Sequence, residues 1–234
     1  MSIENTVPKK NEIAFKWFNH YAGISVRTPT KTLVIDPVDV NTRDFHAVDA
    51  ILITHEHYDH LDGPLVRKLQ EKTQCQIIAD STSTRKLGAF IPAEKLQEMR
   101  PGSEAQIGDV TVRAETCNHS PATTPVTFLI TSEDGVRIFH TADSMPFPEM
   151  KTIGEEHKPD VTFCTVGIAP GTTPGTGVEI VKLVKPKVAV PYHTATKADL
   201  SKFCETLKKE VPKVKCLIAE QGNIYIVGKE QKKK

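Results

Sequence analysis

The 234-residue sequence lacks the features that would direct it into a membrane or a secretory pathway. It contains no apolar run near the roughly 20 residues that a membrane-spanning helix needs, and residues 1–11 lack the apolar core of a signal peptide. It also lacks an excess of either charge, because 30 Lys and Arg residues nearly balance 29 Asp and Glu residues. We therefore expect a cytoplasmic protein, with neither a membrane nor a nucleic acid among its partners.

Cysteine is scarce and irregularly spaced in this chain. The five cysteines are Cys75, Cys117, Cys164, Cys204 and Cys216. They include no Cys-x-x-Cys pair and their number is odd, which argues against a disulfide framework and against a thiolate zinc site. We expect buried free thiols in a reducing compartment.

The composition that is present fits a folded globular protein. Hydrophobic residues make up 38% of the chain and charged residues 25%, which is the balance of an ordered protein and not of a disordered one. The length suffices for a sizeable core. We expect a loose lead-in at residues 1–11, one domain at residues 12–229 and a solvated lysine-rich tail at residues 230–234.

An apolar stretch that ends in a cluster of histidines is the most informative part of the sequence. Residues 50–53 are typical of a strand buried on both faces, and residues 55–60 then read His-Glu-His-Tyr-Asp-His. The candidate ligands here are His55, His57, Asp59 and His60. Asp62 and Pro64 suit the start of a following helix. Imidazole and carboxylate together favour zinc, manganese or iron over calcium or magnesium.

Three further candidate ligands lie far along the sequence. They are His119, Asp143 and His193, and each follows an apolar stretch that is typical of a strand. Because active sites in α/β proteins gather at the ends of strands, we expect these side chains to lie near the first group.

The expected elements predict an α/β fold. Expected strands cover residues 12–19, 24–27, 31–35, 50–53, 76–79, 98–100, 104–107, 110–116, 125–131, 136–140, 161–166, 188–190, 214–219 and 223–227. Expected helices cover residues 65–72, 82–89, 178–184 and 199–209. The second half repeats the rhythm of the first, and mixed sheets need both faces covered. This pattern predicts a four-layer αββα sandwich of two mixed sheets flanked by helices.

The order of these ligands resembles the metallo-β-lactamase superfamily. His-x-His-x-Asp-His at residues 55–60 is followed by a lone His, a lone Asp and a lone His. Residues 35–37 (Ile-Asp-Pro), 140–144 (His-Thr-Ala-Asp-Ser) and 191–193 (Pro-Tyr-His) also resemble motifs of this superfamily. The resemblance covers residues 16–227. Within the superfamily, the sequence is similar to the ascorbate-phosphate-lactonase-like branch of metal-dependent hydrolases.

The resemblance implies two divalent metal ions held by two sets of ligands. The first set is His55, His57 and His119. The second set is Asp59, His60 and His193, and the residue that bridges the ions is Asp143. Zn²⁺ is the expected ion, with Mn²⁺ or Fe²⁺ as alternatives.

Three more residues correspond to supporting positions of the family. Asp36 resembles a carboxylate that orients a ligand imidazole, and His140 resembles a residue behind the ligands. His20 stands where the branch has a Gly-His pair that faces the substrate, with Asn19 in place of the glycine.

Two departures from the family pattern lie beside Asp143. Ala142 replaces the usual glycine, and Ser144 replaces the usual threonine. Both changes are small, and we expect them to reshape the loop that carries the bridging carboxylate.

The activity that the resemblance implies is hydrolysis. We expect a metal-bridging hydroxide to attack a small, anionic lactone or ester, with Asp143 between the ions and Asp59 relaying a proton to the leaving group. Two alternatives stay open: a phosphodiesterase acting on nucleotide, nucleic acid or phospholipid, and a catalytically silent scaffold of the same fold.

The resemblance also allows the protein to form a homo-oligomer. The loop at residues 167–177 either cradles a phosphate at the next helix or is a flexible surface loop.

Overall fold

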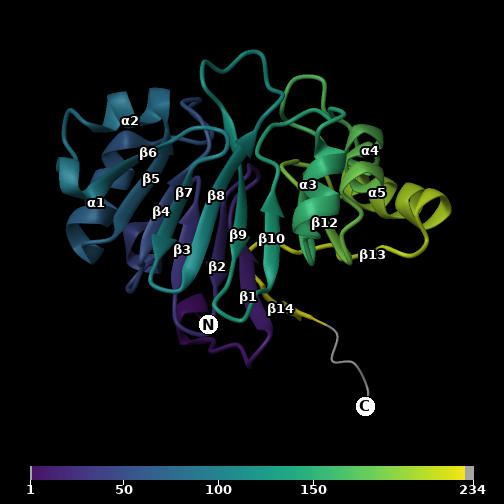
Figure 1. The fold of residues 1–234 in the computed structure, drawn as a ribbon, viewed down its shortest axis with the longest axis horizontal. Helices are drawn as coiled ribbons and strands as arrows, with labels where there is room; N and C mark the ends of the chain where they lie inside the picture. The colour runs from purple at the N-terminus through teal and green to yellow at the C-terminus, as the bar shows by residue number, and fades with distance from the viewer. Residues whose placement is uncertain (1, 230–234) are drawn as a thin grey trace.

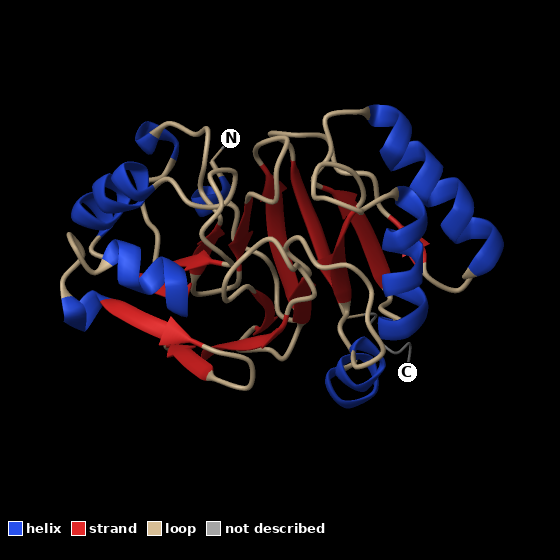
Figure 2. Cartoon of the chain, turned by 90° about the horizontal axis from the view of Figure 1, so that it is seen from above, coloured by secondary structure: helices blue, strands red, loops and turns tan. Residues whose placement is uncertain are grey.

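The strands of this protein form two stacked sheets between two layers of helices (Figure 1). Seen from above, the helices lie on both outer sides with the strands between them (Figure 2). The predicted fold class, a four-layer αββα sandwich, is therefore confirmed. This computed structural model describes residues 2–229, so Met1 and the predicted tail at residues 230–234 lie outside the described residues.

Seven strands form the first sheet, and six of them come from the first half of the chain. They are β1 (Glu12–Trp17), β2 (Ile24–Arg27), β3 (Thr32–Ile35), β4 (Ala50–Ile53), β5 (Gln76–Asp80), β6 (Leu96–Met99) and β14 (Ile224–Gly228). Their order is β14-β1-β2-β3-β4-β5-β6. The pairs from β14 to β3 are antiparallel, and those from β3 to β6 are parallel.

The second sheet repeats this plan with the rest of the chain. Its strands are β7 (Glu104–Ile107), β8 (Val110–Thr116), β9 (Val126–Thr131), β10 (Arg137–His140), β11 (Val161–Thr165), β12 (Val188–Tyr192) and β13 (Lys215–Cys216). Their order is β13-β12-β11-β10-β9-β8-β7. The pairs from β7 to β10 are antiparallel, and those from β10 to β13 are parallel.

Helices cover the outer faces of both sheets. On the first sheet lie α1 (Gly63–Thr73) and α2 (Ser81–Leu87), and on the second lie α3 (Met150–His157), α4 (Pro174–Val184) and α5 (Lys197–Glu210). Short 3-10 turns are η1 (Ile3–Asn5), η2 (Thr42–Asp44) and η3 (Ala93–Lys95). Within residues 2–229, none of the helices has the length and apolar character that crossing a bilayer would require.

The main core lies between the two sheets. Phe15 of β1 meets Phe163 of β11 edge to face, with 5.0 Å between ring centroids. Every residue of β4 and of β11 is buried. Neither strand alternates between apolar and polar residues, because the facing sheet covers one side and helices cover the other. β8 borders solvent and does alternate.

The sequence did not predict α3. Its Gly154 lies so close to the backbone of Val184 that an added Cβ would collide with the Val184 carbonyl. Glycine lowers intrinsic helix propensity by about 1 kcal/mol relative to alanine. This helix is therefore specified by packing against α4, which a local pattern does not reveal.

Helix α4 begins earlier than predicted. The prediction placed its start at Val178, but Thr173 caps a helix that begins at Pro174. The Thr173 hydroxyl accepts from the Thr176 N–H at 3.1 Å, and the Thr176 hydroxyl accepts from the Thr173 N–H at 2.8 Å. The end of the predicted 167–177 loop is therefore helical, and its cap already uses an N–H group that a phosphate would need.

The prediction of five free thiols is wrong for two of them. Cys204 of α5 and Cys216 of β13 form a disulfide, with 5.5 Å between their Cα atoms. Cys75, Cys117 and Cys164 are free, and Cys117 is only partly buried. The pairing follows from α5 lying against β13, a tertiary contact that cysteine spacing does not report.

Part of the segment before β1 contacts the rest of the protein. Ile3 is 4% exposed. The Glu4 carboxylate accepts hydrogen bonds from the backbone N–H groups of His46 and Ala47. The start of the described chain is thereby attached to the segment that leads into β4.

Candidate metal centre

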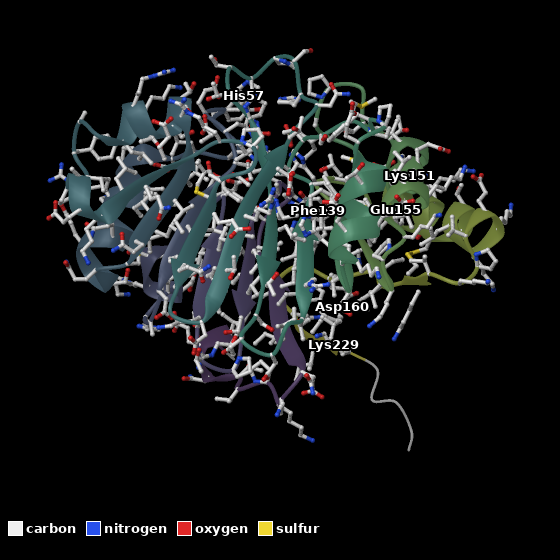
Figure 3. The ribbon with its side chains drawn as sticks, viewed as in Figure 1. His57, Phe139, Lys151, Glu155, Asp160 and Lys229 are labelled. Carbon is white, nitrogen blue, oxygen red and sulfur yellow. A yellow bond between two sulfur atoms is a disulfide. The ribbon has the colours of Figure 1, made fainter. Side chains whose placement is uncertain are left out.

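The loops that follow β4, β8, β10 and β12 meet at one edge of the sandwich. Figure 3 shows His57 at this edge, uppermost in the view, and Lys229 at the opposite edge. Strands of both sheets thus deliver side chains to the same small volume, as expected at the ends of strands in an α/β protein.

The chain turns sharply after β4. The N–H groups of His60 and Leu61 both donate to the carbonyl oxygen of His57, at 3.0 and 2.8 Å. The Asp62 side chain then accepts from the Leu65 N–H and starts α1, as predicted. This turn gathers four side chains of one short motif, which a straight strand would have spread over some 15 Å.

All seven predicted ligand side chains lie in two adjoining clusters. The first cluster is His55, His57, His119 and Asp143, and the second is Asp59, His60, Asp143 and His193. Within each cluster the potential ligand atoms lie within 4.8 Å of one another. Except for the half-buried His57, these residues are buried.

The Asp143 carboxylate is shared between the two clusters. Its Oδ2 lies 3.7 Å from His55 Nε2 and 3.6 Å from His119 Nε2. Its Oδ1 lies 3.0 Å from His60 Nε2 and 2.9 Å from His193 Nδ1. One oxygen therefore faces each cluster, which is the arrangement that a bridging carboxylate requires.

Asp36 and Thr54 fix the orientation of two imidazoles. Asp36 Oδ2 lies 2.7 Å from His60 Nδ1 and accepts the Thr54 hydroxyl proton, also at 2.7 Å. Because that proton is committed to Asp36, Thr54 Oγ1 accepts from His55 Nδ1 at 3.0 Å. Both imidazoles therefore carry their proton on Nδ1 and direct the Nε2 lone pair into the cluster.

Several buried atoms of the clusters have no hydrogen-bond partner. They are His55 Nε2, His60 Nε2, Asp143 Oδ1, His193 Nδ1 and His193 Nε2. The short distances between them lack the aligned N–H that would make hydrogen bonds. Buried polar atoms are rarely left unsatisfied, and a set of imidazole and carboxylate donors matches divalent cations of the zinc type. The residues present therefore fit two such cations.

The comparison with known families agrees with this geometry. The model of the beta-lactamase superfamily domain matches residues 17–194. The chain belongs to the β-lactamase superfamily. The resemblance to this superfamily is thereby confirmed, whereas the narrower lactonase-like branch stays a prediction.

Sequence relatives place the chain in a smaller family within the superfamily. The UPF0173 protein of Pyrococcus abyssi is 31% identical over 77% of this chain and 82% of its own length. The UPF0173 metal-dependent hydrolase of Archaeoglobus fulgidus is 31% identical over 77% of this chain and 83% of its own. This superfamily member thus falls in the family of UPF0173 metal-dependent hydrolases.

Solved structures share the superfamily fold. Igni18, a metallo hydrolase of Ignicoccus hospitalis, superposes with a TM-score of 0.79 at 21% identity, covering 94% of this chain and all of its own. A metal-dependent hydrolase of Parabacteroides distasonis gives 0.75 at 23% identity, covering 89% and 93%. At such identities the likeness concerns the fold alone.

Asp143 and the histidines around it shift one another's pKa values. Burial disfavours its charged form, but His60 and His193 outweigh burial and hold the Asp143 pKa well below its usual range. Burial likewise opposes a charged His60, but Asp143 and Asp36 outweigh it and raise the His60 pKa. Positive charge is therefore favoured in the second cluster, whereas burial lowers the pKa values of His55 and His119 in the first.

His140, predicted near the ligands, is not part of either cluster. Its Nε2 donates to the Ala22 carbonyl at 2.9 Å, and its Nδ1 accepts from the Ala142 N–H at 3.3 Å. Burial lowers the His140 pKa to about 4, so the ring is neutral near pH 7. His140 thereby ties the β1–β2 loop to the loop that carries Asp143.

His20 lies outside the clusters as well. It is exposed, and its Nδ1 accepts from Gln221 Nε2 at 2.9 Å. The ring thus stands at the edge of a hollow and not among the candidate ligands.

The sequence analysis did not identify Glu56 or the two tyrosines near the clusters, Tyr21 and Tyr58. Glu56 Oε1 accepts from the Thr123 N–H and hydroxyl, at 2.8 and 2.6 Å, and so anchors the loop that follows His119. Tyr21 lies with its ring centroid 6.2 Å from that of His193 and 6.4 Å from that of Tyr58. Glu56 could have been found from the sequence, because it lies between the candidate ligands His55 and His57. The tyrosines meet only through tertiary structure.

Proposed function

We propose that this chain hydrolyses a small, anionic lactone or carboxylic ester with two divalent metal ions, Zn²⁺ being the expected pair. The observation that carries the proposal is the Asp143 carboxylate, which turns one oxygen to each of two clusters. In this proposal the first ion is held by His55, His57 and His119, and the second by Asp59, His60 and His193.

When bound, two such cations supply Lewis acidity and lower the pKa of water enough to provide hydroxide near neutral pH. Asp143 would set their spacing from a buried position. Asp36 and Thr54 would hold the imidazoles of His60 and His55 in the tautomer that offers Nε2.

Asp59 would carry the proton. Its Oδ2 lies 3.5 Å from His193 Nε2, and the residue is 7% exposed. Burial opposes its charged form, but His193 and His60 prevail and lower the Asp59 pKa. A carboxylate of the second cluster could accept a proton and pass it to a departing alkoxide. Two cations would exceed the charge of the two aspartates, which favours an anionic substrate.

The decisive variant is His119→Ala, with His46→Ala as its matched control, since His46 is exposed and outside both clusters. Changes merely behind metal ligands typically cost 10–100-fold in affinity or activity. We therefore expect His119→Ala to lose at least about 100-fold in activity, together with bound metal, while its circular dichroism is unchanged. Elemental analysis and a panel of lactones, thioesters and phosphodiesters give the readout.

Each other outcome has a distinct meaning. Full activity of a metal-free preparation of His119→Ala would refute the metal assignment. Preference for bis-aryl phosphodiesters would replace the lactonase proposal with a phosphodiesterase. Two bound metals without turnover of any class would favour a silent scaffold.

A further inference from the structure

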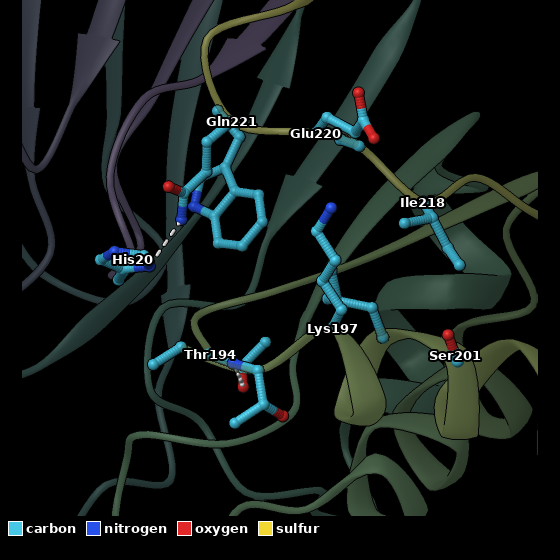
Figure 4. Close-up of a pocket in the computed structure, with 12 residues that line it drawn as sticks. His20, Thr194, Lys197, Ser201, Ile218, Glu220 and Gln221 are labelled. Atoms are coloured by element: carbon cyan, nitrogen blue, oxygen red, sulfur yellow. Dashed lines mark hydrogen bonds between the residues drawn. The ribbon is translucent and has the colours of Figure 1, made fainter.

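A cavity of about 450 Å³ has in its wall a residue that neighbours one of the candidate ligands in the chain. Thr194, which follows His193 in the chain, forms part of its wall. The remaining walls come from the end of β1, the first turns of α5 and the segment after β13 (Figure 4). Through Thr194 the cavity adjoins His193 along the chain, which makes it a candidate site for the remaining atoms of a substrate.

One part of this cavity is apolar. Trp17, Leu200 and Ile218 contribute to it. Trp17 is 2% exposed, and its Nε1 donates to the Tyr21 carbonyl at 2.8 Å, so the indole is fixed in place. A rigid aromatic wall opposite aliphatic side chains suits an apolar body of a few carbon atoms.

Two side chains of the cavity, His20 and Lys197, can offer it hydrogen-bond donors. Gln221 Nε2 donates to the Asn19 carbonyl at 3.0 Å, which fixes the orientation of the amide, and to His20 Nδ1 at 2.9 Å. His20 therefore keeps its proton on Nε2 and offers an N–H. The Lys197 side chain extends into the cavity from α5, across from His20 (Figure 4).

The charges at the rim leave Lys197 available. Among the ion pairs found within residues 2–229, none involves the Lys197 ammonium. The Glu220 carboxylate also borders the cavity, and its Oε2 accepts from Asn223 Nδ2 at 3.2 Å. An ammonium and an imidazole N–H around an apolar hollow select an anion on a hydrocarbon body.

We propose that this cavity binds the arm of the substrate that ends in a carboxylate, with Lys197 and His20 as its recognition groups. This inference rests on the proposed function, because it assigns the part of the same substrate that lies away from the metal ions. The substrate class is then a lactone or ester of a short dicarboxylic acid, in which one carboxyl group stays free.

Trp17 is the only tryptophan of the chain, so its fluorescence reports on the cavity directly. We expect hexanoate to change the fluorescence of the zinc-loaded protein saturably. Lys197→Met should weaken this binding about tenfold or more, since hydrogen bonds to charged groups contribute strongly. Lys202→Met is the matched control, because Lys202 is exposed on the same helix and outside the cavity.

Two further comparisons, with uncharged or cationic probes and with metal-free protein, distinguish failure of this proposal from failure of the proposed function. Hexan-1-ol and hexylamine should bind at least about tenfold more weakly than hexanoate, and hexanoate binding should survive removal of metal by a chelator. Equal binding by Lys197→Met and Lys202→Met would overturn the proposal. So would binding that vanishes on chelation, which would place the anion on the metal ions and leave the proposed function standing. Conversely, hexanoate binding that depends on Lys197 in a protein without turnover would leave the cavity assignment standing while the proposed function failed.

Discussion

Ala142 adopts a left-handed backbone conformation, with φ of 48°, between β10 and Asp143. Asp36 and His193 also have positive φ, at 47° and 57°, so three chain segments bend in this way around the clusters. Asp and His are enriched among residues with positive φ, but a non-glycine residue in this region is uncommon. The position that departs from the family's glycine is therefore one where the backbone itself favours glycine.

The substitution Ala142→Gly should be nearly neutral. Relief of the left-handed conformation is worth about 1–2 kcal/mol, while loss of a buried methyl costs about 0.8 kcal/mol and the freer unfolded chain about 0.4–1 kcal/mol. We expect the free energy of unfolding to change by less than about 1 kcal/mol. Ala142→Val, a β-branched residue at the same φ and fully buried, should cost more than about 2 kcal/mol. Urea denaturation of both variants measures this, and equal stability of the two would contradict the role of backbone conformation.

Among the elements, the disulfide between α5 and β13 is the feature that no pattern of residues indicated. It closes a loop with a sequence separation of 12 residues at one end of the second sheet. β13 is only two residues long and pairs with β12 alone. The covalent bond thus holds an edge that has few backbone hydrogen bonds.

The double variant Cys204→Ser/Cys216→Ser should be less stable than wild type by roughly 2–3 kcal/mol, the amount expected for closing a loop of this length. The difference should appear in urea denaturation without reductant. With excess reductant, wild type should fall to the level of the double variant, whose own stability reductant should leave unchanged. A reductant effect of equal size on both proteins would show that this disulfide is not its cause.

Elements with a strong local pattern were predictable, and elements made by packing were not. The predicted bounds of β2 and β4 agree with the structure, because β2 alternates apolar and polar residues and β4 is a run of four apolar residues. α3 and the disulfide depend on contacts between distant segments. The same holds for the cavity, whose walls come from both ends of the chain. For the candidate ligands, strand ends were signal enough to bring His119 and His193 into consideration.

For the molecule as a whole, the two clusters lie at the junction of the two sheets. The residues of the motif at 55–60 follow β4 of the first sheet. His119, Asp143 and His193 follow β8, β10 and β12 of the second. Each proposed cation would therefore take ligands from both sheets, so binding would cross-link the two halves of the sandwich in addition to preparing the site.

This arrangement predicts that metal binding stabilises the entire fold. A ligand present at 100 times its dissociation constant stabilises by about 2.7 kcal/mol, which for a chain of this length corresponds to roughly 5–11 °C in the unfolding temperature. Chelation of wild type should lower the unfolding temperature by about this much, and added zinc should restore it. Asp143→Asn should lose most of this metal-dependent difference, because both proposed cations would share that carboxylate. Asp109→Asn, which changes an exposed aspartate in the turn between β7 and β8 and outside both clusters, should keep it. The comparison uses the shift between chelated and loaded protein within each variant, so any stability that Asp143→Asn loses by itself cancels. An equal shift in Asp143→Asn and Asp109→Asn would mean that the cations do not join the two sheets through Asp143.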